Sequence, residues 1–214
     1  MIRYDKFKPQ IKPVELKYIL TVPTGYSKDE KLPLIVFLHG AGERGDDIEN
    51  VKVHGVPKLF CNNCDYNGTR TITLSPLCPE NITWLDLKKE LFALIESVCS
   101  EYNIDTERVA LCGISMGGFG TWELAMTRPE MFCKIAPMCS GGMSWRANVL
   151  KMPIRAFHGR LDDDVPLELS QVMVDAVNAS GGDATLTIYD DLYHNCWDRA
   201  FEKTDLINWL VTLK

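Results

Sequence analysis

The chain has 214 residues and a mass of 24.2 kDa, which suits one domain built around a single core. Hydrophobic residues make up 46% and charged residues 24%, so the composition excludes an intrinsically disordered or collagen-like chain. A net charge of −6, with no cluster of Lys and Arg to offset it, argues against a nucleic-acid partner and against an anionic membrane surface.

The first nine residues carry charges where a signal peptide needs an apolar core, and no apolar run is long enough to span a membrane. The sequence as written therefore predicts a cytoplasmic protein. Most of the eight cysteines are expected to be reduced thiols that pack as small hydrophobic residues, because four of them lie within apolar segments: Cys99, Cys112, Cys133 and Cys139.

Cys61 and Cys64 form a Cys-x-x-Cys pair, a spacing found in metal and redox sites. No second such pair and no paired histidines follow at zinc-site spacing, so a structural role is favoured and no metal is expected. A disulfide between the two stays open for the case that the protein is exported.

Apolar, β-branched runs predict strands at 18–22, 34–38 and 71–74, the first two joined by a turn. Apolar residues at helical spacing predict a helix over 87–102. Beyond it, strands and helices alternate: strands at 108–112, 135–138, 154–157 and 185–189, and helices at 118–127, 167–178 and 200–213.

Continuous apolar strands that alternate with helices predict a mostly parallel sheet covered on both faces, which is a three-layer α/β/α fold. No internal repeat, low-complexity segment or linker interrupts the pattern, so residues 1–214 are expected to form one domain. The segment Ser140–Met152 is short and leaves little room for a cap.

The most informative motif is Gly113-Ile-Ser115-Met-Gly117, directly between the strand at 108–112 and the helix at 118–127. A serine flanked by glycines at such a junction is typical of a nucleophile elbow, in which the turn is so sharp that side chains at the flanking positions would clash. The elbow would hold the Ser115 hydroxyl at the N-terminus of the helix. The alternative is a glycine-rich turn with an incidental serine.

A serine hydroxyl is a weak nucleophile near neutral pH and needs a histidine to accept its proton. Among the four histidines, only His194 lies between the last strand and the last helix, where the base is found in the chain order nucleophile, acid, histidine. The alternative is that His194 is a surface-loop histidine with no catalytic role. His39 is expected to brace its loop, and His158 to pack at a strand end.

For the carboxylate that orients the histidine, we favour Asp162, because its segment follows a strand and precedes a helix, at the sheet edge where Ser115 emerges. Three adjacent aspartates cannot all be buried without partners, so two of them are expected to be solvated or to cap the next helix. Asp164 is the second choice, followed by Asp190 and Asp191.

His39-Gly40-Ala41-Gly42 follows the strand at 34–38 and predicts a tight turn. In such a turn the backbone N–H of Ala41 can join that of Met116 in an oxyanion hole. Glu43 and Arg44 can reach the mouth of the site, although an ion-paired loop is the simpler interpretation.

Three tryptophans lie in segments expected to reach the same edge of the sheet, where an aromatic surface can hold a phenolic acyl group or a sugar ring. These candidate substrate-binding residues are Trp84, Trp145 and Trp197. For Trp197, packing beneath the His194 loop is an equally favoured alternative.

Taken together, these motifs resemble the α/β-hydrolase superfamily over nearly the whole chain. They look like the compact carboxylesterases, within the group labelled predicted peptidases or phospholipase/carboxylesterase-like, which is related to feruloyl and acetylxylan esterases. The resemblance implies a mainly parallel eight-stranded sheet, a Ser115, Asp162, His194 triad, oxyanion donors at Ala41 and Met116, a covalent acyl-enzyme and no cofactor.

The expected function is therefore hydrolysis of carboxylic esters by a serine esterase acting on small or aromatic esters, feruloyl and acetyl-sugar esters among them. A serine peptidase or thioesterase on the same fold is the first alternative. A non-catalytic binding protein of the same fold is the least favoured, because a binder has no reason to keep all three triad residues.

Overall fold

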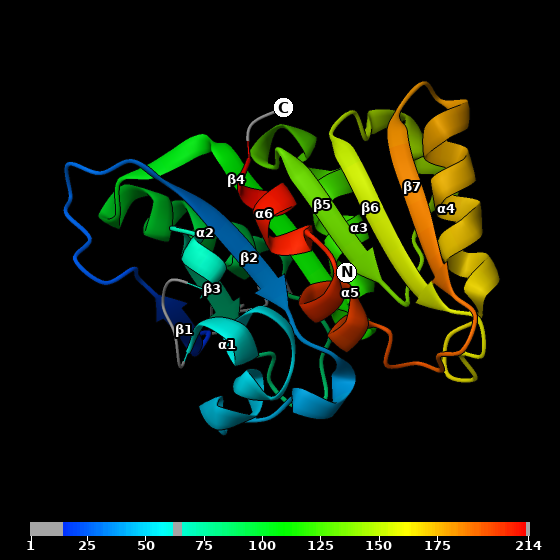
Figure 1. Cartoon of the computed structure of the whole chain (residues 1–214), viewed down its shortest axis with the longest axis horizontal. Helices are drawn as coiled ribbons and strands as arrows, with labels where there is room; N and C mark the ends of the chain where they lie inside the picture. The colour runs from blue at the N-terminus through cyan, green and yellow to red at the C-terminus, as the bar shows by residue number, and fades with distance from the viewer. Residues whose placement is uncertain (1–14, 62–65, 213–214) are drawn as a thin grey trace, which may run out of the picture.

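The computed structural model describes residues 15–61 and 66–212, and their core is one mixed sheet (Figure 1). Seven strands lie in the order β1-β3-β2-β4-β5-β6-β7, where eight were expected. Only β1 runs antiparallel to its neighbour, and the other five pairs are parallel. The strands are β1 (Tyr18–Thr21), β2 (Leu32–Leu38), β3 (Ile72–Pro76), β4 (Ile104–Ile114), β5 (Lys134–Met138), β6 (Pro153–Gly159) and β7 (Asp183–Tyr189).

Helices cover both faces of this sheet, as the alternating pattern predicts. One face packs against α2, α3 and α4, and the other packs against α1, α5 and α6. The helices are α1 (Gly55–Phe60), α2 (Lys88–Glu101), α3 (Met116–Thr127), α4 (Leu167–Ala179), α5 (Trp197–Lys203) and α6 (Leu206–Val211).

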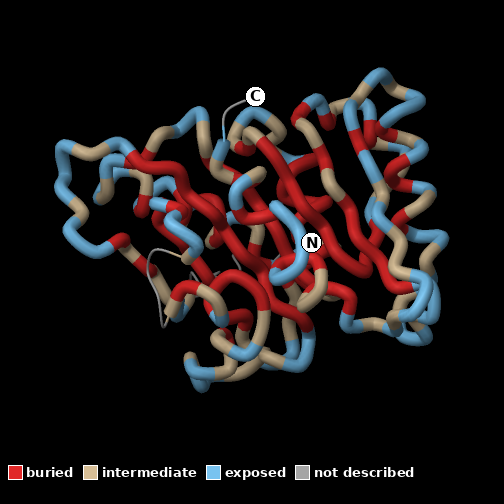
Figure 2. Tube along the Cα trace, viewed as in Figure 1, coloured by how far each residue is buried: buried red, intermediate tan, exposed pale blue. Residues whose placement is uncertain are grey.

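Strand β2 shows why the sheet needs two helical layers. Its side chains alternate between the two faces, and both sets are fully buried. Leu34, Val36 and Leu38 belong to the core under α2 and α3, whereas Ile35 and Phe37 belong to the core under α1, α5 and α6. The central strands are accordingly buried along most of their length, and the exposed residues concentrate in the outer loops and helices (Figure 2).

One feature of the chain connectivity was not predicted, and one expectation was wrong. Strand β1 does not pair with β2, because β3 lies between them and pairs with both. The expected closing helix over 200–213 is divided into α5 and α6, with Thr204 in an extended conformation at the break. The Thr204 hydroxyl donates to the Ala200 carbonyl and accepts the Leu206 N–H, so it ends one helix and begins the next.

The parallel strands bring several loops to one edge of the sheet. Strands β2, β4, β6 and β7 all end there, and Ala41, Ser115, Asp162 and His194 follow these strands in that order. In an open parallel sheet, ligands bind at this carboxyl edge. The connection from β5 to β6 holds only a 3-10 helix (Ser144–Val149), so no cap is inserted at that point.

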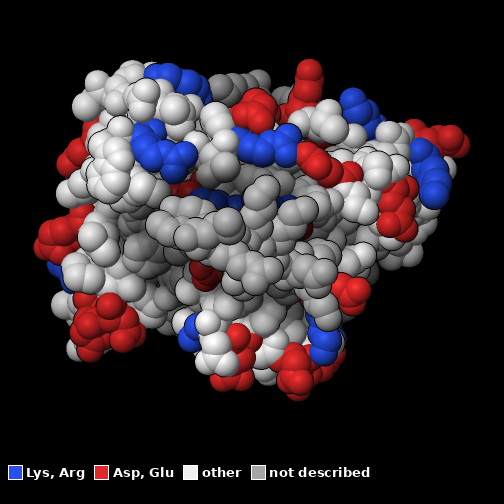
Figure 3. Space-filling view, turned by 180° about the vertical axis from the view of Figure 1, so that it is seen from behind, with Lys and Arg blue, Asp and Glu red and all other residues white. Residues whose placement is uncertain are grey.

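On the face seen in Figure 3, basic side chains lie along the upper edge and are interspersed with acidic ones, which occur on every side. Among residues 15–61 and 66–212, no helix combines the length and apolarity that a membrane span requires.

Candidate active site

The turn between β4 and α3 holds Ser115 in a strained backbone conformation. Its φ is 50° and its ψ is −118°, a region that residues with side chains rarely adopt. The Ser115 N–H donates to the Met138 carbonyl at 2.9 Å, which ties the turn to the end of β5. The turn therefore has the geometry of a nucleophile elbow, with the hydroxyl at the N-terminus of α3.

The flanking glycines allow α3 to cross the sheet at very short range. A Cβ atom on Gly117 would overlap the Leu38 carbonyl at the end of β2, and one on Gly113 would overlap the Gly117 carbonyl. Any side chain at either position would push α3 away from the strands. The glycines of the motif thus set the height of Ser115 above the sheet.

Three side chains that are distant in sequence meet at this point. His194 Nε2 lies 2.8 Å from Ser115 Oγ, and His194 Nδ1 lies 2.8 Å from Asp162 Oδ2. When the His194 ring is neutral and protonated at Nδ1, the Ser115 hydroxyl donates to Nε2 and the Nδ1–H donates to the carboxylate. The Asp162 side chain is fully buried and that of His194 is 18% exposed. This arrangement can carry a proton from the serine to the histidine.

The Asp162 carboxylate receives hydrogen bonds at both oxygens. Oδ1 accepts the backbone N–H groups of Asp164 at 3.0 Å and Val165 at 2.9 Å, while Oδ2 contacts His194 and, at 3.1 Å, His158 Nε2. Burial raises the pKa of Asp162, but the hydrogen bonds from His194 and the backbone outweigh it and lower the pKa overall.

The other candidate acids make different contacts. Asp164 is exposed, and its backbone N–H donates to Asp162 Oδ1. Asp190 pairs with Arg160, and Asp191 pairs with Arg199, both at exposed positions. Among the four, Asp162 is the one whose carboxylate bonds the His194 ring.

His194 lies in a setting that favours its charged form. Burial lowers the pKa of His194, but the neighbouring Cys139 and Asp162 side chains act in the opposite direction and raise it to about 9. A carboxylate beside an imidazole stabilises the imidazolium that forms when the ring accepts a proton.

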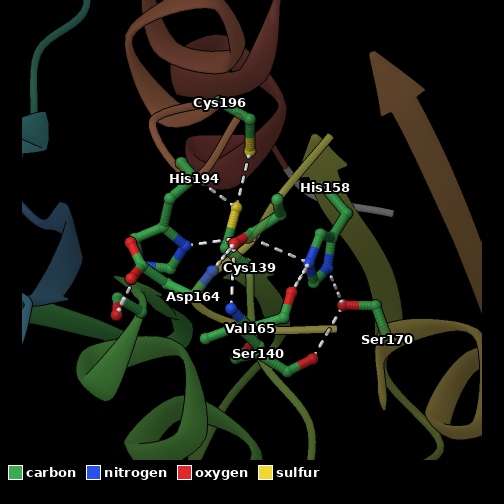
Figure 4. A network of polar contacts seen from close by, with 10 residues as sticks. Cys139, Ser140, His158, Asp164, Val165, Ser170, His194 and Cys196 are labelled. Carbon is green, nitrogen blue, oxygen red and sulfur yellow. Dashed lines mark hydrogen bonds and ion pairs between the residues drawn. The ribbon is translucent and has the colours of Figure 1, made fainter. Parts of the chain in front are cut away.

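A pair of thiols beneath His194 escaped the sequence analysis. Cys139 Sγ lies 3.0 Å from the His194 carbonyl and 3.2 Å from Cys196 Sγ (Figure 4). The Cys196 thiol lowers the pKa of Cys139, although burial acts against this, and the pKa of Cys196 is raised. The sequence did hold a local indication of this pair, because Cys196 lies only two residues after the candidate base His194. Cys64 lies outside the described residues, so a Cys61–Cys64 bridge stays untested.

The loop after β2 is braced by a buried histidine, as expected. His39 Nε2 accepts the Cys78 N–H at 3.0 Å, and Nδ1 donates to the Gly40 carbonyl at 2.6 Å. Burial lowers the pKa of His39 to about 4, so the ring is neutral near neutral pH. Ala41 begins the next 3-10 helix (Ala41–Glu43).

A pocket of about 400 Å³ opens beside Ser115. Trp197 forms part of its wall, with its ring 5.2 Å from that of His194 and nearly perpendicular to it. Glu43, which the sequence placed within reach of the mouth of the site, lines the pocket, and so does Asp164, which was considered only as the triad acid. The lining residues are Ala41, Gly42, Glu43, Ser115, Asp164, Val165, His194 and Trp197.

The other two tryptophans do not reach this pocket. Trp84 is fully buried and its Nε1–H donates to the His39 carbonyl at 2.9 Å, so the expected substrate contact is wrong. Trp84 instead fills the core beneath the loop that follows β2. Trp145 is 78% exposed on the 3-10 helix between β5 and β6 and is absent from the pocket lining.

Ligand-type side chains also cluster at this edge. Two groups have ligand atoms within 4.8 Å of one another, and both share Asp162: one with Cys139 and His158, the other with Asp164 and His194. The shared carboxylate is already engaged by a hydrogen bond with His194 and an ion-pair contact with His158, so we assign no metal ion to these groups.

The sequence profile of the phospholipase/carboxylesterase family matches residues 85–210, more than half of the chain. The chain belongs to this family. The matched region contains Ser115, Asp162 and His194, and it begins after the loop that holds Ala41.

Two relatives share a third of their aligned residues with this family member. The bifunctional acetylxylan esterase/xylanase XynS20E of Neocallimastix patriciarum is 33% identical over 115 residues, which is 54% of this chain and 15% of that protein. A crystal structure of a thermostable esterase is 33% identical with a TM-score of 0.86, covering 95% of this chain and 60% of that one. The chain thus spans less than two thirds of either relative.

More distant structures share the fold alone. The feruloyl esterase module from Clostridium thermocellum, solved with sinapinate, is 18% identical with a TM-score of 0.68 over 90% of this chain and 81% of that one.

The close approach of α3 to β2 predicts a stability effect at Gly117. Gly117→Ala should lower the free energy of unfolding by about 2–3 kcal/mol, because the new methyl group meets a backbone carbonyl that cannot move aside. Gly42→Ala is the matched control, since a Cβ there meets nothing within 4 Å, and it should change stability by less than about 0.5 kcal/mol. Urea unfolding curves measure both, and equal effects would contradict the interpretation.

His39 predicts a pH dependence of stability. The pKa of His39 is about 4 in the folded protein, and its ordinary value of 6.5 applies to the unfolded chain. Between pH 6.5 and pH 4 the unfolded chain therefore binds more protons, and the free energy of unfolding falls as the pH falls. The loss should total about 3 kcal/mol at 1.36 kcal/mol per unit. Unfolding free energies of wild type and His39→Gln at pH 7 and pH 4 test this, because the variant lacks this component. Parallel pH curves for the two proteins would refute it.

Proposed function

We propose that this chain is a serine ester hydrolase with Ser115 as nucleophile, His194 as general base and Asp162 as the orienting acid. The observation that carries the proposal is the unbroken pair of 2.8 Å contacts from Ser115 Oγ through His194 to the buried carboxylate, at the wall of a pocket. Membership of the phospholipase/carboxylesterase family supports ester hydrolysis as the reaction.

In the first half of the reaction, Ser115 Oγ attacks the ester carbonyl while its proton passes to His194 Nε2. Asp162 holds the ring in the required tautomer and stabilises the imidazolium. His194 then returns the proton to the alcohol as it leaves, and an acyl group remains on Ser115. In the second half, water gives a proton to His194 and attacks the acyl carbonyl, and His194 then returns that proton to Ser115 Oγ as the acid is released.

Negative charge develops on the carbonyl oxygen in both halves. We assign its stabilisation to the backbone N–H groups of Ala41 and Met116. Met116 is the first residue of α3, where helix N–H groups have no partner within the helix, and Ala41 lines the pocket. One such donor contributes about 3 kcal/mol in other acyl-transfer enzymes.

The pocket wall favours neutral substrates that carry hydroxyl groups. Glu43 and Asp164 carry carboxylates that accept hydrogen bonds from hydroxyls and repel anions. Trp197 offers an aromatic edge beside them. Acetylated sugars and feruloyl esters have these features, and the curated relative is named an acetylxylan esterase/xylanase. We therefore propose small or aromatic esters of this kind as substrates.

Loss of the nucleophile is the direct test of the mechanism. Ser115→Ala should lower kcat/KM for p-nitrophenyl acetate by about 10⁴-fold or more, and a fluorophosphonate probe should label wild type at Ser115 only. Ser97→Ala, at an exposed position on α2, is the control and should keep full activity. A panel with an acyl thioester and a peptide anilide separates esterase from thioesterase and peptidase. Folded wild type that resists the probe would rule the mechanism out.

The acidic pocket wall predicts charge selectivity. Asp164→Asn should raise kcat/KM for p-nitrophenyl hemisuccinate relative to the neutral acetate by about fivefold, because removing a nearby charge in a solvated site changes the energy by about 1 kcal/mol. Asp163→Asn is the matched control, since Asp163 is an exposed neighbour that does not line the pocket. The same ratio in both variants would remove Asp164 from the substrate contacts.

A further inference from the structure

The proposed mechanism makes no use of His158, although this buried ring touches the acid. His158 is fully buried near the end of β6. Its Nδ1 lies 2.7 Å from Ser170 Oγ on α4, and its Nε2 lies 2.9 Å from the Val165 carbonyl and 3.1 Å from Asp162 Oδ2 (Figure 4). The sequence analysis expected a packing role at the strand end.

The Ser170 hydroxyl fixes the proton on one side of the ring. Ser170 Oγ also lies 2.7 Å from the Ser140 carbonyl oxygen. A carbonyl only accepts, and a serine hydroxyl has one hydrogen, so Ser170 gives that hydrogen to Ser140. Its oxygen can then only accept from His158, which places a proton on Nδ1.

The other side of the ring faces acceptors as well. The Val165 carbonyl and the ionised Asp162 carboxylate have no hydrogen to give, so His158 Nε2 must also carry a proton. A neutral imidazole has one N–H. Either neutral tautomer would leave one of these short contacts without a hydrogen, in a buried place where an unmade hydrogen bond is costly. The doubly protonated ring donates from Nδ1 to Ser170 Oγ and from Nε2 to the Val165 carbonyl, and it places a positive charge 3.1 Å from Asp162 Oδ2.

We propose that His158 is held as a buried imidazolium. It then acts as a positioning residue that weakens the electrostatic attraction between the Asp162 carboxylate and the protonated His194 ring. The two histidine rings contact one oxygen of the carboxylate, Oδ2: His158 approaches it from the end of β6, and His194 approaches it from the loop after β7. Part of the Asp162 charge is then balanced by His158. This inference rests on the proposed function, because it assigns a role in setting the basicity of the His194 base.

The charged groups around His158 determine the sign of its effect. Asp162 faces it from the loop that follows β6, and Cys139 faces it from the end of β5. His194 and the exposed Asp164 lie on the far side of Asp162, and α4 presents the neutral Ser170 hydroxyl. A positive charge on His158 opposes the rise in the His194 pKa that Cys139 and Asp162 produce. Removing that charge should make His194 harder to deprotonate.

The protonation state can be measured directly in the full chain. We expect ¹⁵N NMR at pH 7.5 to show two directly bonded hydrogens on the His158 ring and both nitrogen shifts in the imidazolium range. Only four histidines are present, so His39→Gln, His54→Gln and His194→Gln variants assign the signal without altering His158. One protonated nitrogen on His158 would overturn the proposal, whether or not the protein hydrolyses esters.

The effect on the base is read from the pH profile of kcat/KM, whose acidic limb reports the free-enzyme His194. His158→Asn and Ser170→Ala should each move this limb upward by about one pH unit, so that kcat/KM at pH 6 falls about tenfold more than at the plateau. Ser170→Ala removes the acceptor at Nδ1 and leaves the ring in place, so it covers the case that His158→Asn does not fold.

Ser75→Ala is the matched control, because Ser75 is equally buried but lies on β3 and its hydroxyl has no partner among the described residues. Its acidic limb should not move. If Ser170→Ala lowers kcat/KM equally at every pH, His158 is merely structural and the proposal fails. If wild type resists the fluorophosphonate probe while NMR shows the imidazolium, the proposed function fails and the charge assignment stands.

Discussion

The site depends on how one buried carboxylate is kept charged. An ionised carboxylate away from water is costly unless hydrogen bonds replace its hydration. Asp162 receives them from two backbone N–H groups on its own loop and from the His194 ring, and the His158 ring lies 3.1 Å from its Oδ2. Each donor fixes the position of the segment that carries it. The same contacts that solvate the charge therefore hold the acid loop, β6 and the His194 loop together.

The sheet supplies the rigidity that these contacts need. Leu38, at the end of β2, is covered so closely by α3 that only glycine fits at position 117. Ser115 is tied through its N–H to Met138 at the end of β5. The nucleophile is thus fixed to two strands by backbone contacts, which shift less than side-chain contacts do. The His194 loop then needs to bring only one ring to the serine.

Local patterns predicted much of this arrangement. The apolar run around Val36, the helical spacing of Leu91 and Ile95, and the glycines around Ser115 each follow from near neighbours in the sequence. The segment that holds Asp162 was chosen because it follows a strand and precedes a helix, with Asp164 as the second choice. The structure puts that residue, and not Asp164, against the His194 ring.

Contacts between distant segments were not predictable in the same way. Nothing near Trp84 in the sequence indicates that its indole is enclosed beneath the β2 loop, with its N–H on the His39 carbonyl. The insertion of β3 between β1 and β2 and the break at Thr204 likewise depend on tertiary packing. The ring of His158 was placed at a strand end, but its contact with Asp162 depends on how the following loop folds back.

The short connection between β5 and β6 has a consequence for how an ester can arrive. With only a 3-10 helix in that connection, no inserted domain roofs the carboxyl edge there, and the pocket beside Ser115 is open to bulk solvent. An acyl group attached midway along a polymer can enter from above without threading a free end. Contacts to the remainder of such a molecule would then have to come from the surface around the pocket opening, and that surface would determine the selectivity between polymers.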